Sequence, residues 1–329
     1  MCLKIEKFGC IIITERMQFM QTMQNGIPWS FFWNQRQTNC QRWLAAEVGI
    51  MKILTLNTHS LLEDDYQQKL NDFVEGILKE MPDIIAMQEV NQTANTDLMD
   101  LNMLEGQYPI PGCMSIRRDN HAAVVANRLR RAGIACYWVW LPIKLGYGKY
   151  DEGIAILSLG RRIRCVDKFP ISKVNDYHNW RTRAVLGVQV EGVSDWFYCV
   201  HMGWWDDASE RFLDQWKVLN CCIASKRMCG NVWLMGDFNA PDVIPGQSYE
   251  HMTACGWIDT YQVAQFKDCG ITVPGVIDGW REKLAGKKVD GMRLDYIWCS
   301  KRNEILSSRV VFNGMKEPVV SAARASTSD

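Results

Sequence analysis

Short apolar runs that end in polar residues recur along the chain. Residues 53–56 are followed by Asn57, and residues 83–87 are followed by Gln88 and Glu89. Runs of this length predict buried strands, with the polar residues at the strand ends. A helix is predicted between the two runs from apolar residues at helical spacing, which are Leu70, Phe73, Val74, Ile77 and Leu78. Strand, helix and strand in this order indicate an α/β fold.

The same pattern continues through the middle of the chain. Residues 120–133 predict an amphipathic helix, and residues 196–200 predict a buried strand that ends at His201. Asp207 is the expected N-cap of the next helix, because Glu210 follows it at the spacing of a capping box. The expected inward stripe of that helix consists of Phe212, Trp216, Leu219 and Ile223.

Residues 232–241 combine an apolar run with a polar turn. Asp237 and Asn239 leave the end of this run two residues apart. A strand end is rigid, so it would hold a carboxylate and an amide at fixed positions. In phosphate chemistry, the carboxylate would position a water or accept its proton, and the amide would hold a phosphoryl oxygen as charge builds on it. An Asx-turn that merely ends a strand is the alternative.

A glycine-punctuated loop and two other positions are candidates for contact with a substrate. The loop at residues 145–152 carries Tyr147 and Tyr150, whose rings are suited to covering a sugar or a base. Packing within the loop is the alternative. Trp204 follows a predicted strand and could edge a pocket, and Arg183 stands at the start of another predicted strand. We expect these four residues to bind substrate.

Composition narrows the class of protein. Of the 329 residues, 47% are hydrophobic and 22% are charged, as in ordinary globular proteins. Lys+Arg and Asp+Glu both number 37, and this balance favours a small substrate, because domains that bind long nucleic acids usually carry a basic excess. Thirteen cysteines without a CxxC pair indicate free thiols and no zinc cluster. No apolar run is long enough to span a membrane, so we expect a cytoplasmic protein.

The N-terminal segment differs from the rest of the chain. Residues 1–50 are rich in Met and Gln and show no sustained period, whereas a clean strand begins at Met51. We expect residues 1–50 to be an extension that is non-native or poorly ordered, and residues 51–329 to form the folded domain. A small helical layer around Trp29 and Trp33 is the alternative.

Five predicted strand ends thus carry polar residues, which are Asn57, Glu89, His201, Asp237 with Asn239, and Asp295. Their order, with the contexts Gln-Glu-Val, Gly-Asp-Phe-Asn and Leu-Asp-Tyr-Ile, resembles the endonuclease/exonuclease/phosphatase superfamily from about Met51 to Ser321. The resemblance implies an α/β fold in the form of a four-layer sandwich, in which two face-to-face mixed β-sheets are flanked by helices, as in deoxyribonuclease I. It also implies hydrolysis of phosphoesters with Mg²⁺, or alternatively Mn²⁺.

The resemblance implies a role for each of these residues. Asn57 and Glu89 match the metal site of the family, with Glu89 as its principal carboxylate. Asp237 matches the residue that orients or deprotonates the attacking water. Asn239 matches the amide that holds the phosphate, and His201 matches a histidine that contacts it.

Asp295 matches a residue whose usual partner is the histidine of a Ser-Asp-His motif near the C-terminus. In this chain Ser321 is followed by Ala322, Ala323 and Arg324. We therefore expect a truncation or a frame change that removes the imidazole, exposes a sheet edge and impairs catalysis.

Within the superfamily, residues 54–60, 146–153 and 201–205 look most similar to bacterial maltose 6'-phosphate phosphatases. This similarity implies a phosphatase for a small phosphorylated sugar, with nucleic acid the less favoured partner. A nuclease of the exonuclease III type is the alternative, because aromatic rings that pack on sugars also stack on bases. A catalytically silent binding protein that lacks the terminal histidine is the third possibility.

Overall fold

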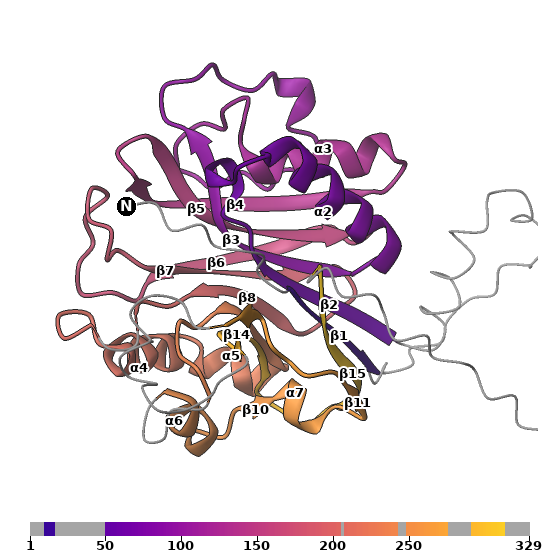
Figure 1. Cartoon of the computed structure of the whole chain (residues 1–329), viewed down its shortest axis with the longest axis vertical. Coiled ribbons are helices and arrows are strands. Elements are labelled where there is room, and N and C mark those ends of the chain that lie inside the picture. Colours follow the sequence, from indigo (N-terminus) through magenta and orange to yellow (C-terminus); the bar gives the residue numbers. More distant parts are fainter. Residues whose placement is uncertain (1–9, 17–49, 205–206, 243–247, 276–290, 313–329) are drawn as a thin grey trace, which may run out of the picture.

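The computed structural model describes residues 10–16, 50–204, 207–242, 248–275 and 291–312. Two β-sheets pack face to face, and helices cover both outer faces (Figure 1). In that figure α2 and α3 lie above the sheets, and α4, α5 and α6 lie below them. This arrangement confirms the four-layer α/β sandwich that the sequence predicts.

In the described residues the first sheet has seven strands in the order β11-β15-β1-β2-β3-β5-β4. These strands are β1 Cys10–Arg16, β2 Ile50–Asn57, β3 Ile84–Thr93, β4 Cys136–Gly146, β5 Tyr150–Leu159, β11 Phe266–Lys267 and β15 Glu304–Val311. Strands β2 and β3 are parallel because the helix α2, Tyr66–Glu80, crosses over between them. The helix α3, His121–Arg131, covers the same outer face.

The second sheet has six strands within the described residues, in the order β10-β14-β9-β8-β7-β6. They are β6 Ile163–Pro170, β7 Ala184–Val190, β8 Trp196–His201, β9 Val232–Asp237, β10 Ile258–Asp259 and β14 Asp295–Cys299. Strands β8 and β9 are parallel, and the helices α4 Phe212–Cys222 and α5 Ala224–Cys229 connect them. The smaller elements are η2 Ser60–Leu62, η3 Leu101–Met103, α6 Ser248–Ala254, α7 Thr260–Val263, β12 Val273–Pro274 and β13 Gly291–Met292.

Three apolar clusters separate the four layers. Successive side chains of a strand point to opposite faces of its sheet. Ile53 of β2 therefore packs between the two sheets, whereas Leu54 packs under α2 and α3. On the far side, Phe212 and Trp216 of α4 pack on the second sheet. Both sheets are thus buried on two faces, so the strand ends are held by rigid cores.

Three elements differ from the sequence pattern. Strand β3 does not stop at Gln88; it continues to Thr93 through an irregularity at Glu89. The predicted loop at residues 145–152 is a tight hairpin, because β4 and β5 pair as far as Gly146 and Tyr150. Helix α4 begins at Phe212, several residues later than the predicted capping box.

The N-terminal segment contributes one described strand. Strand β1 pairs antiparallel with β2 on one side and with β15 on the other. Residues 10–16 thus occupy an interior place in the first sheet, inside the segment that the sequence predicts as an extension. The alternative helical layer around Trp29 and Trp33 lies outside the described residues, as does the segment around Ser321 where a truncation or a frame change is expected.

Two expectations from composition concern thiols and membranes. Cys136, Cys199 and Cys299 are buried, as their apolar surroundings predict. Among the described residues, no helix combines the length and the apolar character needed to cross a membrane.

Candidate active site

Three of the predicted residues meet at one end of the second sheet. Asp237 at the end of β9 is the register partner of His201 at the end of β8. It is also the partner of Asp295 at the start of β14, on its other side. Adjacent strands lie about 4.8 Å apart, so these three side chains form one row. All three residues are buried.

Two more predicted residues lie at the corresponding end of the first sheet. Asn57 ends β2 and is the register partner of Gln88 in β3. The next residue, Glu89, has a φ of 52°, which is uncommon for a residue with a side chain. This left-handed residue breaks the pairing of β3 with β5, and the extra residue re-aims the side chain. The bulge thereby brings the Glu89 carboxylate beside Asn57.

The Asn57 amide joins the two sheets. Its Nδ2 donates to Glu89 Oε1 at 2.9 Å and to Asp237 Oδ2 at 3.2 Å. The His201 Nε2 lies 4.0 Å from the same Glu89 oxygen and 4.0 Å from the same Asp237 oxygen. The tips of both sheets therefore converge on one site, as the order of polar strand ends predicts.

The turn after β9 places Asn239 next to this group. The Asn239 backbone N–H donates to Asp237 Oδ1 at 2.7 Å. This bond forms the Asx-turn that the sequence allows as the alternative interpretation of residues 232–241. Its side-chain Nδ2 donates to the carbonyl of Met202 at 2.9 Å. Asn239 itself has a φ of 48°. The turn and the candidate amide are thus one structure rather than alternatives.

Burial strongly perturbs the carboxylates at the centre. Desolvation raises the pKa of Asp237 to about 6, against the hydrogen bonds from Asn239 and Asn57, which lower it. Burial, and then the nearby Asp237 charge, raise the pKa of Asp295 well above its usual range. Among the described residues, Asp295 Oδ1 has no hydrogen-bond partner. The charges of Asp237, Asp295 and Glu89 repel one another, and a nearby cation would relieve this repulsion.

The imidazole of His201 is neutral in this setting. Burial is the main cause that lowers its pKa well below the usual value, and the cations Arg183 and Lys144 lower it further. A neutral imidazole has one N–H and one acceptor nitrogen. His201 is therefore suited to donating a hydrogen bond to an oxygen without carrying a charge.

The comparisons with known proteins agree with this geometry. A model of the Endonuclease/Exonuclease/phosphatase family matches residues 54–321, which is most of the chain. The chain belongs to this family. Members of the family are hydrolases, phosphatases among them. The family-level resemblance of the motifs is thereby confirmed, whereas maltose 6'-phosphate as substrate stays a prediction.

Several solved structures are similar to the chain. An endonuclease/exonuclease/phosphatase family protein from Leptotrichia buccalis C-1013-b is 30% identical, with a TM-score of 0.67 over 80% of this chain and 92% of that one. A family protein from Bacteroides thetaiotaomicron is 15% identical, with a TM-score of 0.51 over 78% and 84%. A protein described as a mannosyl-6-phosphatase from B. thetaiotaomicron VPI-5482 is 15% identical, with a TM-score of 0.49 over 78% and 87%. No curated protein matches the chain.

The donor set of the candidate site fits a hard divalent cation. Within the described residues, no three His, Cys, Asp or Glu side chains group as ligands of one metal ion. Magnesium does not require three, because it is commonly bound through one or two carboxylates and keeps several waters. Glu89 supplies a carboxylate and Asn57 an amide oxygen, and both are oxygen donors of the kind that Mg²⁺ prefers. The mutual repulsion of Glu89, Asp237 and Asp295 would be relieved by a bound cation.

The candidate site has a basic side that the sequence pattern reveals only in part. The predicted Arg183 is buried. Burial lowers the pKa of its guanidinium, and the nearby carboxylates of Glu152 and Glu89 offset only part of this effect. Lys144 and Glu152, which the sequence does not single out, form a buried ion pair with 2.9 Å between Nζ and Oε1. The two residues face each other across the β4–β5 hairpin.

A second histidine also lies at the site. The His59 Nε2 is 3.4 Å from Glu89 Oε2, and its Nδ1 is 3.9 Å from Glu63. It follows Asn57 by two residues, so the strand end that carries the predicted amide also carries this imidazole. A histidine two residues after a candidate metal ligand is the signal that could have found it.

The predicted aromatic residues take different places. Tyr147 is 74% exposed at the tip of the β4–β5 hairpin. Tyr150 is buried, and its hydroxyl donates to the carbonyl of Leu61 at 3.5 Å, so it supports the wall rather than projecting from it. Trp204 is half-buried in the loop after β8. The exposed Trp180, with the Arg181 guanidinium 4.3 Å from its ring centre, is an aromatic residue that the sequence does not single out.

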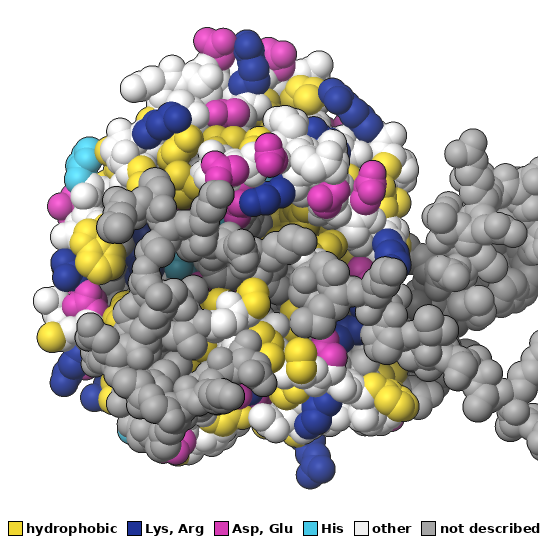
Figure 2. Space-filling view, viewed as in Figure 1, with side chains coloured by type: hydrophobic (Ala, Val, Ile, Leu, Met, Phe, Trp, Pro, Cys, Tyr) yellow, Lys and Arg dark blue, Asp and Glu magenta, His cyan; other side chains and the backbone are white. Residues whose placement is uncertain are grey.

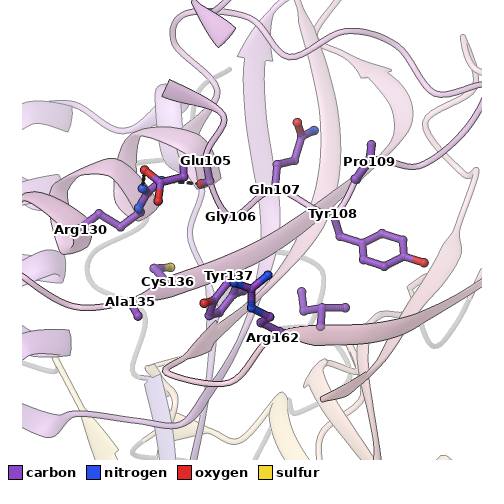
Figure 3. A pocket seen from close by; sticks show the side chains of 11 residues that line it. Glu105, Gly106, Gln107, Tyr108, Pro109, Arg130, Ala135, Cys136, Tyr137 and Arg162 are labelled. Atoms are coloured by element: carbon purple, nitrogen blue, oxygen red, sulfur yellow. Dashed lines mark hydrogen bonds and ion pairs between the residues drawn. The ribbon is translucent and has the colours of Figure 1, made fainter. Parts of the chain in front are cut away.

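The pocket in Figure 3 is distinct from this site. A cavity of about 340 Å³ lies between Glu105, Arg130, Tyr137 and Arg162. It includes Cys136 at the far end of β4, eight residues before Lys144 and so about 25 Å away along a strand. None of the converging strand ends lines it. A second cavity, of about 490 Å³, is lined by Asn57, Thr58 and Glu63 and so adjoins the candidate site.

Proposed function

We propose that the chain is a metal-dependent phosphomonoester hydrolase that acts on a sugar phosphate such as maltose 6'-phosphate. The observation that carries the proposal is the double hydrogen bond of the Asn57 amide to Glu89 and Asp237. It joins the tips of the two sheets through Asn57 and Asp237, which are 180 residues apart in the sequence. A carboxylate, an amide and a second, perturbed carboxylate in contact are the parts that phosphoester hydrolysis requires.

Each residue of this group has a chemical task in the proposed reaction. Glu89 and Asn57 would hold Mg²⁺, which, when bound, supplies positive charge to the phosphate oxygens. Asp237 accepts a proton from the attacking water, since its pKa of about 6 lies close to neutral pH. The Asn239 amide and the neutral His201 donate hydrogen bonds to phosphoryl oxygens as negative charge builds on them.

Surface charge supports a small substrate over a long nucleic acid. On the face shown in Figure 2, Lys and Arg side chains alternate with Asp and Glu, and no continuous basic band is visible outside the grey atoms. The formal net charge is zero. Binding to a duplex depends on a basic stripe that follows the phosphates. The exposed aromatic rings of Tyr147 and Trp180 are suited to pack on sugar rings.

The proposal is tested by substrate preference. Purified protein with Mg²⁺, or with EDTA, is offered maltose 6'-phosphate, other hexose phosphates, and abasic or double-stranded DNA. We expect release of inorganic phosphate from a sugar phosphate, loss of that release with EDTA, and no strand nicking. Asp237→Asn should remove the activity, whereas Asp97→Asn, which changes an exposed aspartate, should retain it.

Two results would contradict the proposal. Nicking of DNA without release of phosphate from sugars would favour the nuclease. Retention of a sugar phosphate without turnover at any Mg²⁺ concentration would favour a silent binding protein.

A further inference from the structure

Two buried cations lie side by side next to the proposed phosphate site. Lys144 of β4 and Arg183, which precedes β7, are 8% and 7% exposed. Both donate to the backbone carbonyl of Trp180, Lys144 Nζ at 3.3 Å and Arg183 Nη1 at 2.7 Å. The two positive groups therefore share one neutral acceptor and lie close together.

One carboxylate is in direct contact with this pair of cations, and its partner is Lys144. Glu152 accepts from Lys144 at 2.9 Å. Among the described residues, Arg183 has no carboxylate within 4 Å. The carboxylates of Glu152, Glu89 and Asp237 act on the guanidinium from a greater distance. A buried charge that lacks a charged partner in contact is costly, and a bound anion would supply one. One positive charge of the pair is thus uncompensated by direct contact.

Hydrogen bonds connect Arg183 to the predicted phosphate-binding amide. Arg183 Nε donates to the carbonyl of Met202 at 3.3 Å, and Asn239 Nδ2 donates to the same carbonyl at 2.9 Å. The remaining bonds of the guanidinium come from Nη1, so Nη2 donates to no protein group within the described residues. The ammonium group of Lys144 has three N–H donors and uses two of them, for the Trp180 carbonyl and the Glu152 carboxylate. Each cation keeps a donor for a ligand.

We propose that Lys144 and Arg183 together bind the terminal oxygens of a phosphate dianion and so select phosphomonoesters over phosphodiesters. The inference rests on the proposed function, which it deepens by naming the charge state of the substrate. A monoester has a dianionic terminal group at neutral pH, whereas a diester carries a single negative charge and an additional substituent. Two buried cations in a setting of low dielectric favour the dianion, because each interaction is screened little. A role confined to holding the Trp180 carbonyl would not distinguish the two ester classes.

The closing experiment compares two esters with the same leaving group. Initial rates on para-nitrophenyl phosphate and on bis-para-nitrophenyl phosphate are measured with Mg²⁺ for wild type, Lys144→Met and Arg183→Met. We expect kcat/KM for the monoester to fall by about 10- to 100-fold, the range for one lost hydrogen bond to a charged group, and that for the diester by less than about threefold. Lys144→Arg should restore most of the monoester rate. Lys217→Met, which removes an exposed lysine on α4, is the matched control and should change neither rate.

A binding measurement separates this inference from the proposed function. The affinity for inorganic phosphate is measured by calorimetry in the Mg²⁺-loaded protein, and we expect Lys144→Met to weaken it at least about tenfold. If wild type turns over no ester, the proposed function fails, yet weaker phosphate binding by the variant still supports the inference. Unchanged phosphate affinity, or an equal fall for both esters, overturns it. If Lys144→Met does not fold, the double variant Lys144→Met/Glu152→Gln, which removes both charges of the ion pair, and Arg183→Met carry the same test.

Discussion

His121 provides a measurable link between pH and stability. It begins α3, is fully buried and stacks on Phe73. Its Nδ1 lies within hydrogen-bond distance of the Tyr66 hydroxyl, at 3.0 Å. Burial, and then the charge of Arg128, lower its pKa from 6.5 to about 3. Protonation therefore favours the unfolded chain.

The magnitude follows from the two pKa values. The stability that neutral His121 allows is fully present above pH 6.5 and is lost as the pH falls towards about 3, because only the unfolded chain takes up the proton in that interval. At pH 5 the loss amounts to about 2 kcal/mol, since one pKa unit corresponds to about 1.4 kcal/mol. This is a large fraction of the stability of a typical domain, which is about 5–15 kcal/mol.

The assay is urea unfolding followed by tryptophan fluorescence at pH 8 and pH 5, for wild type and His121→Gln. Glutamine can accept from Tyr66 and does not titrate, so the difference between the two proteins isolates this group. We expect the free energy of unfolding of wild type to fall about 2 kcal/mol further than that of the variant. His251→Gln, which changes an exposed histidine on α6, should behave as wild type. Equal pH dependence of wild type and His121→Gln would refute the reasoning.

Three further predictions concern the site. Glu89→Gln should lower the rate of phosphate release at least about 100-fold, as loss of a charge-stabilising group does, with partial recovery at high Mg²⁺; full activity in EDTA would contradict a metal role. Asp237→Asn should abolish turnover yet stabilise the metal-free protein at pH 8 by about 1–3 kcal/mol, because it removes a buried carboxylate whose pKa is raised to about 6. Urea unfolding measures this change in the free energy of unfolding, and a loss of stability would argue against the raised pKa. Gly236→Ala should destabilise the fold by about 3 kcal/mol, because a Cβ at this position would lie 1.8 Å from the Val200 carbonyl oxygen and the φ of the residue is 152°. A melting temperature equal to that of wild type would contradict this close approach.

The sequence is informative where local pattern and tertiary position coincide. Asn57, His201 and Asp237 end short apolar strands, and a buried strand that ends in a polar residue places that residue at a sheet tip. Two parallel pairs, β2 with β3 and β8 with β9, bring these tips to the same end of each sheet. Local spacing thus suffices to predict which side chains emerge at one edge.

The pattern fails where a long-range contact decides the outcome. The spacing of Asp207 and Glu210 matches a capping box, yet the Glu210 carboxylate accepts from the backbone N–H groups of Lys173 and Val174. Asp207 accepts from Glu210 in a turn that precedes the helix, and it pairs with Arg181. A distant segment thus competes for the carboxylate, and the helix begins later than predicted.

Lys144 shows a second reason for failure. It lies in a strand of otherwise apolar and aromatic residues, where a lysine is usually read as an exposed position. Its burial depends on Glu152, which faces it across a hairpin whose register includes an irregularity after Pro142. Register is set by the turn and the neighbouring strands, and spacing alone does not define it.

The charges of the site have a common logic. Four carboxylates, those of Glu89, Asp237, Asp295 and Glu152, lie with the two cations Lys144 and Arg183 in one electrostatic environment. If all were ionised, an excess of negative charge would remain, and the raised pKa values of Asp237 and Asp295 are the response of the protein without a cation. A divalent cation beside Glu89 would offset that excess, and the basic pair would then attract a phosphate. In the proposed reaction the carboxylates therefore serve the metal, and Lys144 with Arg183 serves the terminal phosphate oxygens.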